Sequence, residues 1–190
     1  MSQTATRSIQ GIEIPEPGDW QLDPVHTAVE FSARHLMVSK VRGTFHGVSG
    51  NIHISDDPLG SWVEVKIDPA TVETGDAKRD EHLRSPDFFD VERYPEITFR
   101  STRVEGDSPG GFRLEGELTV HGVTRPVTLD VEYHGWTPSP LGDRRAGFSA
   151  TTEVDREDFG LTWNVALETG GVLVGKKAKL DFEIEAIKQD

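Results

Sequence analysis

Three basic side chains near the middle of the chain are the residues best suited to bind a charged group. Arg79 and His82 are three positions apart and would share one face of a helix, and Arg84 follows two residues later. Two guanidinium groups can hold a pyrophosphate through paired hydrogen bonds, whereas a quinone carbonyl would need fewer donors. The alternative is that these basic residues only fasten their segment to the fold by pairing with Asp80, Glu81, Asp87 and Asp90.

Residues that could support catalysis lack the spacing of active-site motifs. The seven histidines include no His-Glu-x-x-His pair, and the chain has no cysteine and no Gly-x-Ser-x-Gly turn. The segment from Gly106 to Gly111 is typical of a hairpin turn and not of a phosphate loop. His26, shortly after Asp23, is expected to fix the start of a strand by hydrogen bonding. We therefore expect no enzyme and no metal site, and a metal-dependent hydrolase is the less favoured alternative.

The charge balance limits the partners of this chain. Among its 190 residues, 20 Lys and Arg stand against 33 Asp and Glu, which gives a net charge of −13. An acidic surface repels phosphate backbones, so we expect no nucleic-acid partner and at most transient membrane contact. The absence of cysteine excludes disulfides and zinc–thiolate sites. Residues 1–18 are polar and lack the apolar core of a signal peptide, so we expect a cytoplasmic location.

Alternation of apolar and polar residues, which is typical of strands with one buried face, dominates the chain from Trp20 onward. In residues 112–120, for example, the even positions are apolar or glycine and the odd positions are charged or threonine. About eight such strands would close into a small antiparallel barrel without exposed sheet edges. We predict a mainly all-β fold, with 1–18 as a flexible N-terminal tail and 19–190 as one β-barrel domain.

One long segment, Asp68 to Pro95, does not alternate and is too long for a hairpin turn. Within it, residues 76–84 have a helix-forming composition, and Thr74 or Asp76 could cap the helix. We therefore predict a short helical insertion near 76–92.

Alternation alone leaves open whether the barrel is filled or hollow, and it favours the filled one. Small residues at inward positions would leave space in a hollow barrel but would face large residues in a filled one. These small residues are Ala33, Gly43, Gly116, Ala146, Ala150 and Ala178. A hollow interior would be lined by Phe31, Phe45, Phe88, Phe89, Phe99, Phe112, Leu114, Leu118, Leu129, Val131, Phe148, Phe159, Trp163 and Phe182. For Phe88 and Phe89, plugging one end and ordinary core packing are equal alternatives.

Several spaced motifs resemble those of one protein family. The chain carries Trp20-x-Leu22-Asp23-x-x-His26, then Arg34-His35 and Val41-Arg42-Gly43-x-Phe45. Next come Arg79-Asp80-x-His82-Leu83-Arg84-Ser85-x-Asp87-Phe88-Phe89-Asp90 and Tyr94-Pro95-x-Ile97-x-Phe99. The last is Gly116-x-Leu118-Thr119-x-x-Gly122-Val123-Thr124-Arg125-Pro126-Val127. Together they resemble the YceI-like, polyisoprenoid-binding family, from Trp20 to about Ile184.

The resemblance implies a lipocalin-like, extended antiparallel barrel with a long isoprenoid chain in an apolar pore, and often a dimer. It turns the preference toward a hollow interior. We therefore expect a non-catalytic carrier of polyprenol, polyprenyl phosphate or isoprenoid quinone, a homodimer, and no cofactor besides the bound lipid. The alternative is a filled-barrel dimeric stress or interaction module that binds no lipid. Many relatives resemble secreted, periplasmic proteins, unlike the cytoplasmic location expected here.

Overall fold

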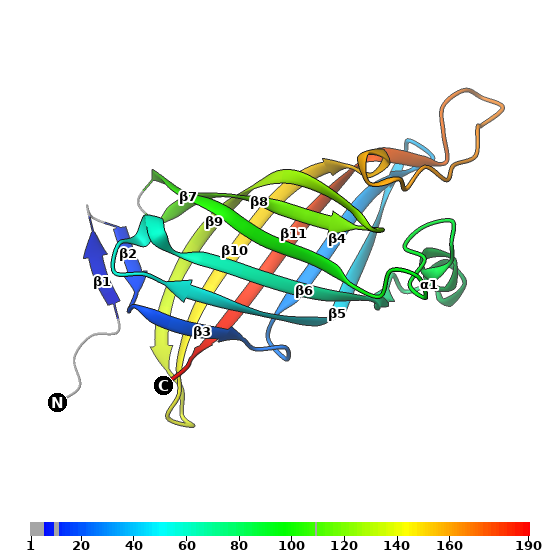
Figure 1. The fold of residues 1–190 in the computed structure, drawn as a ribbon. Coiled ribbons are helices and arrows are strands. Elements are labelled where there is room, and N and C mark those ends of the chain that lie inside the picture. The colour runs from blue at the N-terminus through cyan, green and yellow to red at the C-terminus, as the bar shows by residue number, and fades with distance from the viewer. Residues whose placement is uncertain (1–5, 10–11, 109) are drawn as a thin grey trace.

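The strands of this protein wrap around one axis and form a closed sheet (Figure 1). The computed structural model describes residues 6–9, 12–108 and 110–190. The first half contains β1 (Thr6–Ile9), β2 (Ile12–Pro15), β3 (Gly18–Leu22), β4 (Ala28–His35), β5 (Ser39–Ile54), η1 (Pro58–Gly60), β6 (Trp62–Glu73) and α1 (Ala77–Arg84). The second half contains β7 (Ile97–Ser108), β8 (Gly111–Val120), β9 (Val123–Pro138), β10 (Arg144–Asp155), η2 (Arg156–Phe159) and β11 (Val174–Lys188).

Eight of the described strands close the barrel. From β4 to β11, each strand pairs antiparallel with the next strand in the sequence, and β11 pairs back with β4. The predicted antiparallel β-barrel of about eight strands is therefore confirmed. Closure leaves none of these eight strands as an open sheet edge.

A further strand, β3, extends the wall at one end of the barrel. β4 pairs with the first part of β5, Ser39–Phe45, and β3 pairs with its last part, Asn51–Ile54. On the other side, β3 pairs with the end of β11, where Leu22 lies opposite Ala186. β3 and β4 therefore share one position in the wall, and residues 23–27 form the break between them.

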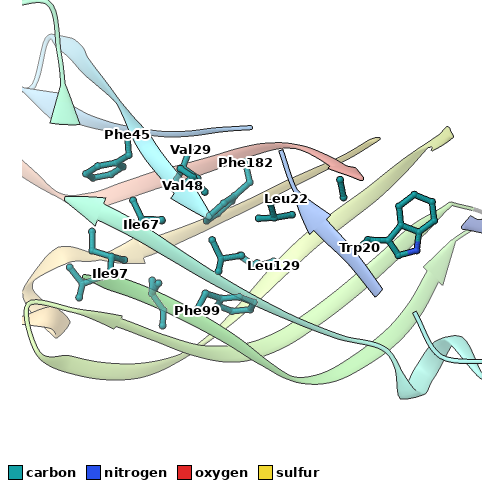
Figure 2. Close-up of a cluster of buried hydrophobic side chains, with 14 of the residues drawn as sticks. Trp20, Leu22, Val29, Phe45, Val48, Ile67, Ile97, Phe99, Leu129 and Phe182 are labelled. Carbon is teal, nitrogen blue, oxygen red and sulfur yellow. The ribbon is translucent and has the colours of Figure 1, made fainter. Parts of the chain in front are cut away.

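Inward-facing side chains pack closely in much of the interior (Figure 2). A Cβ atom on Gly43 would lie 2.4 Å from the Phe31 ring, and one on Gly116 would lie 2.5 Å from the Phe99 ring. At these two positions the small residue makes room for a ring from a neighbouring strand. The expectation that these two glycines leave empty volume is therefore wrong.

The predicted helical insertion is confirmed as α1, which is followed by turns. The Asp76 side chain caps the helix by accepting hydrogen bonds from the backbone N–H groups of Lys78, at 3.0 Å, and Arg79, at 3.2 Å. At the other end, the N–H of Ser85 donates to the carbonyl oxygen of His82. Figure 1 shows α1 at the end of the barrel opposite the β1–β2 hairpin.

The N-terminal segment differs from the predicted flexible tail. Residues 6–9 and 12–15 pair as an antiparallel hairpin, and Ile14 and Pro15 are buried. The hairpin is attached by Arg7, which donates to the carbonyl oxygens of Ser55 and Asp56. The tail prediction is therefore wrong for these two strands, because apolar burial and long-range hydrogen bonds order a segment of polar composition. Residues 1–5 and 10–11 of the predicted tail lie outside the described residues.

Candidate functional site

An apolar cavity lies inside the barrel toward the end that carries η1 and β2. Its volume is about 130 Å³. Side chains from most strands of the barrel line it, together with Ile14 and Pro15 of the N-terminal hairpin and Pro58, Ser61 and Trp62 around η1. The hairpin therefore covers this end of the interior, and its buried side chains form part of the cavity wall.

The chemistry of the wall is that of a hydrocarbon. Among the described lining residues, Ser61 and Trp62 are the two whose side chains carry a polar atom, and none is ionisable. A wall of this kind favours an apolar guest over water. The arrangement can bind a hydrocarbon chain, and its lining supplies no acid or base for a reaction.

Half of the residues predicted to line the interior are in the cavity wall. They are Phe99, Phe112, Leu114, Leu129, Val131, Phe148 and Phe182. The prediction missed Leu22, Ile52, Ile54, Val63, Val65, Val104 and Ile184, most of which lie on the apolar faces of alternating segments. Ala150, predicted as a small inward residue, also lines the cavity. It also missed Ile14, Pro15, Pro58, Ser61 and Trp62, because no local pattern connects these residues with the barrel interior.

Three other predicted residues fill the interior near α1. The Phe45 ring lies 5.5 Å from both the Phe31 and Phe89 rings, measured between ring centres. Phe31 and Phe89 meet edge to face at 6.3 Å. This cluster, which we call the Phe31–Phe45–Phe89 plug, occupies the interior at the α1 end. The predicted hollow interior is therefore interrupted by these three rings at the α1 end.

The remaining predicted residues lie outside the cavity wall. Phe88 and Trp163 pack together at 5.3 Å, and His82 contacts the Phe88 ring at 5.0 Å and the Trp163 ring at 4.6 Å. Phe159 and Leu118 are buried members of the core. These side chains pack against the protein itself.

The three head-group candidates bind their own segment of the chain. Arg79 donates to the side-chain oxygen of Thr74 at 2.7 Å and to its carbonyl oxygen at 3.0 Å. Arg84 donates to the carbonyl oxygens of Ala70, at 2.8 Å, and Val72, at 3.1 Å. These bonds attach α1 to the end of β6, so both guanidinium groups have a structural role here.

His82 and Asp80 complete this attachment. His82 Nε2 lies 2.8 Å from a carboxylate oxygen of Asp87. Asp80 is buried and accepts hydrogen bonds from the backbone N–H of Thr74, at 2.8 Å, and from its hydroxyl, at 2.6 Å. None of Arg79, His82 and Arg84 is among the residues that line the cavity.

A second polar cluster lies beyond the end of β3. Asp23 and His26 of the break meet Arg145 of β10 and Glu185 of β11 there. Ligand atoms of Asp23, His26 and Glu185 lie within 4.8 Å of one another, a spacing that could suit a metal ion. The Arg145 guanidinium donates to both carboxylates, at 2.7 Å and 2.5 Å. The cation of this cluster is therefore an arginine, and a metal ion beside it would be repelled.

Hydrogen bonding controls the ionisation of Asp23. The pKa of Asp23 is lowered from its ordinary 3.8 to about 2, first by the hydrogen bond with His26 and further by the Val25 N–H and Arg145. The pKa of Arg145 is raised by its bonds with Asp143, Glu185 and Asp23. As predicted, His26 fixes a strand start: it bonds Asp23 in the break that precedes β4.

An antiparallel barrel closed around a small apolar cavity defines a lipocalin-like architecture. Within the described residues, no helix has the length and apolar character needed to cross a bilayer. The YceI-like domain matches residues 20–186, and the chain belongs to this family. The β1–β2 hairpin lies outside the matched range.

Similar proteins agree with this assignment. A UPF0312 protein of Staphylococcus aureus strain N315 is 36% identical over 172 residues, which cover 88% of this chain and 96% of the relative. A crystal structure of the Campylobacter jejuni YCEI protein has 29% identity and a TM-score of 0.69, covering 83% of this chain and 90% of that chain.

Two more distant crystal structures share the fold. BcnA of Burkholderia cenocepacia has 19% identity and a TM-score of 0.74, covering 86% of this chain and 98% of that chain. A polyisoprenoid binding domain from Saccharophagus degradans has 17% identity and a TM-score of 0.64, covering 90% of this chain and 98% of that chain.

Proposed function

We propose that this protein is a non-catalytic carrier that holds part of an isoprenoid lipid in the apolar cavity of its barrel. The observation that carries the proposal is the cavity wall, whose described residues are almost all hydrocarbon and include no ionisable side chain. Burial of hydrocarbon there removes it from water, which contributes about 0.8 kcal/mol per CH₂ group.

The choice of an isoprenoid rests on the family and on one structural relative. The relative from Saccharophagus degradans is described as a polyisoprenoid binding domain, and it shares the fold of this chain. Polyprenol, polyprenyl phosphate and isoprenoid quinone all carry the same repeating five-carbon chain, so all three are candidate ligands. A cytoplasmic location and a homodimer stay predictions.

The size of the cavity limits how much of the lipid it can hold. A cavity of about 150 Å³ is sufficient for benzene, which has six carbons. The 130 Å³ available here therefore suits about one five-carbon isoprene unit. A longer chain needs the Phe31–Phe45–Phe89 plug to move aside, or it must leave the barrel past η1.

The test is to identify what the protein carries. Organic extraction of protein purified from its native source, followed by mass spectrometry, should give an isoprenoid in near-stoichiometric amount. The variant Ala150→Phe places a ring in the cavity. It should reduce the extracted isoprenoid at least about tenfold, because several carbons of the lipid can then no longer be buried there.

The matched control is Ala178→Phe, which adds the same ring at a half-buried position of β11 outside the cavity wall. This variant should retain the isoprenoid. A native extract without lipid would contradict the carrier function and favour the filled-barrel interaction module. Equal loss of lipid in both variants would contradict the assignment of the cavity as the binding site.

A further inference from the structure

Four large apolar side chains are exposed together at the α1 end of the barrel. The turn between β4 and β5 exposes Leu36 by 40%, Met37 by 56% and Val38 by 81%, and the neighbouring loop of residues 160–173 exposes Val165 by 46%. The N–H of Leu36 donates to the carbonyl of Leu173, and the N–H of Leu173 donates to that of Val165. These bonds hold the turn and the loop side by side, and we call the four residues the apolar tip.

The backbone of the turn is an unusual place for such side chains. Leu36 has φ 52° and Met37 has φ 63°, in the left-handed region where Gly, Asn or Asp is favoured. Polar or small residues would therefore suit both the backbone and the contact with water. Neither local conformation nor solubility explains a leucine, a methionine and a valine in succession at this position.

The loop beside the turn is held firmly. Arg156 is buried and donates to four carbonyl oxygens, those of Leu161, Trp163, Val174 and Gly175. Asn164 adds a pair of hydrogen bonds with the backbone of Val174, at 2.7 Å and 3.0 Å. Val165 is thus presented to the outside by an anchored backbone.

Two stretches of sequence at the apolar tip are basic, in contrast to the chain as a whole. Residues 31–55 and 169–180 contain no Asp or Glu, although the net charge of the chain is −13. These two segments carry six of the 20 Lys and Arg residues, namely Arg34, Lys40, Arg42, Lys176, Lys177 and Lys179. All six side chains are exposed.

The strand register gathers four of these cations, Arg34, Lys40, Arg42 and Lys179, on the outer face of three neighbouring strands. Arg34 of β4 lies directly opposite Lys40 of β5, and Ser32 lies between Arg42 and Lys179. Like charges directly opposite each other are destabilising in a sheet. Lys176 and Lys179 pair with Glu157 and Asp181, and the register sets Lys177 and Lys179 opposite Asp155 and Glu153 of β10. None of the described ion pairs relieves the Arg34–Lys40 pair or includes Arg42, so these three residues are the cations available to lipid phosphates.

We propose that the apolar tip and its surrounding cations dock reversibly on the surface of an anionic lipid bilayer. Leu36, Met37, Val38 and Val165 enter the boundary between headgroups and acyl chains, and the cations contact lipid phosphates. Glu168 lies in the same loop as Val165, and its carboxylate opposes the attraction to anionic headgroups and keeps the contact weak. The net charge keeps the rest of the molecule away from the surface and fixes its orientation.

This inference goes beyond the carrier function, because docking does not require an occupied cavity. Figure 1 shows both parts of the apolar tip at the end of the barrel opposite η1, near which the cavity lies. The docked barrel would therefore stand with the α1 end at the bilayer and the cavity end away from it.

The test measures sedimentation of the full chain with vesicles of phosphatidylcholine alone or with about 30% phosphatidylglycerol, at 50 and 500 mM NaCl. At low salt we expect at least about fivefold more bound protein on the anionic vesicles, and loss of most of this difference at high salt. The double variant Met37→Asp with Val38→Asp should bind about tenfold less. Its folding is not at risk at position 37, because Asp tolerates a positive φ.

Two further variants complete the design. Lys40→Glu with Arg42→Glu should remove the preference for anionic vesicles. Val25→Asp with Leu141→Asp changes two apolar residues that are 82% and 86% exposed elsewhere, and it should bind like the unchanged protein.

Three results would overturn docking through the apolar tip. They are equal binding of the unchanged protein to both vesicle types, no binding to either, and undiminished binding of the Met37→Asp, Val38→Asp variant. Self-association without vesicles that this variant abolishes would instead assign the apolar tip to a second copy of the chain. Lipid extraction from the cavity is a separate measurement, so a failure of docking is distinguishable from a failure of the carrier function.

Discussion

Asp23 is nearly buried, and three neighbours stabilise its charge. Because its pKa in the folded protein, about 2, lies below the ordinary 3.8, this stabilisation is fully present above about pH 4 and is lost as the pH falls through about 2. A pKa change of this size corresponds to about 2 kcal/mol. We predict that Asp23→Asn lowers the free energy of unfolding by about 2 kcal/mol at pH 7, measured by urea denaturation.

The matched control for Asp23→Asn is Glu132→Gln, which removes an exposed carboxylate from β9. This variant should change the free energy of unfolding by less than about 0.5 kcal/mol. The Asp23→Asn protein should also lose less stability than the unchanged protein between about pH 4 and pH 2. An unchanged pH dependence in Asp23→Asn would show that its charge does not stabilise the fold.

Gly116 leaves room for the Phe99 ring in the core because it has no side chain, and this role can be tested directly. A Cβ atom at Gly116 would lie 2.5 Å from that ring and 2.5 Å from the carbonyl oxygen of Arg100. We predict that Gly116→Ala lowers the free energy of unfolding by about 1–3 kcal/mol, because the ring and the strand must shift. Gly147→Ala is the control, since its nearest described atom, Cβ of His134, is 3.7 Å away. Comparable losses in both variants would refute this assignment.

The strands and the helix could be predicted because residues close together in the sequence determine them. Alternation located the strands because the side-chain period of a strand is local. The helix-forming composition of residues 76–84 located α1, and of the two predicted caps, Thr74 and Asp76, the structure uses Asp76. The β1–β2 hairpin was missed because its attachment joins Arg7 to Ser55 and Asp56, 48 or 49 positions away. Likewise, sequence revealed the charges of Arg79 and Arg84 but not the carbonyl oxygens that the folded chain places beside them.

The hairpin covers one end of the cavity, so its attachment should control how fast a ligand leaves. Arg7→Ala removes the hydrogen bonds to the carbonyl oxygens of Ser55 and Asp56. A loss of about 1 kcal/mol from this attachment would raise the dissociation rate of a fluorescent prenyl probe roughly fivefold. Stopped-flow displacement measures this rate.

The control for the hairpin is Arg113→Ala, which removes an exposed arginine from the outer face of β8. It should leave the dissociation rate unchanged. Equal rates for Arg7→Ala and the unchanged protein would mean that ligand does not leave past the hairpin.

The interior of the barrel differs between its two ends, and this difference limits how a lipid can bind. Near η1 the cavity of 130 Å³ suits about one isoprene unit, and near α1 the Phe31–Phe45–Phe89 plug fills the space. In a continuous tunnel each further unit of five carbons would contribute up to about 4 kcal/mol. If the plug stays in place, further units contribute little, because they remain in water or must displace three aromatic rings.

This difference predicts how affinity depends on chain length. In the unchanged protein, farnesol and geranylgeraniol should bind with Kd values within about fivefold of each other, because neither extends past the plug. Phe89→Ala removes one ring of the plug and should strengthen geranylgeraniol binding at least about tenfold relative to farnesol. Phe88→Ala is the control, since Phe88 packs against His82 and Trp163 outside the cavity wall. A steep gain with chain length in the unchanged protein would mean instead that the rings move aside at little cost, and the plug would then be a gate that the lipid itself opens.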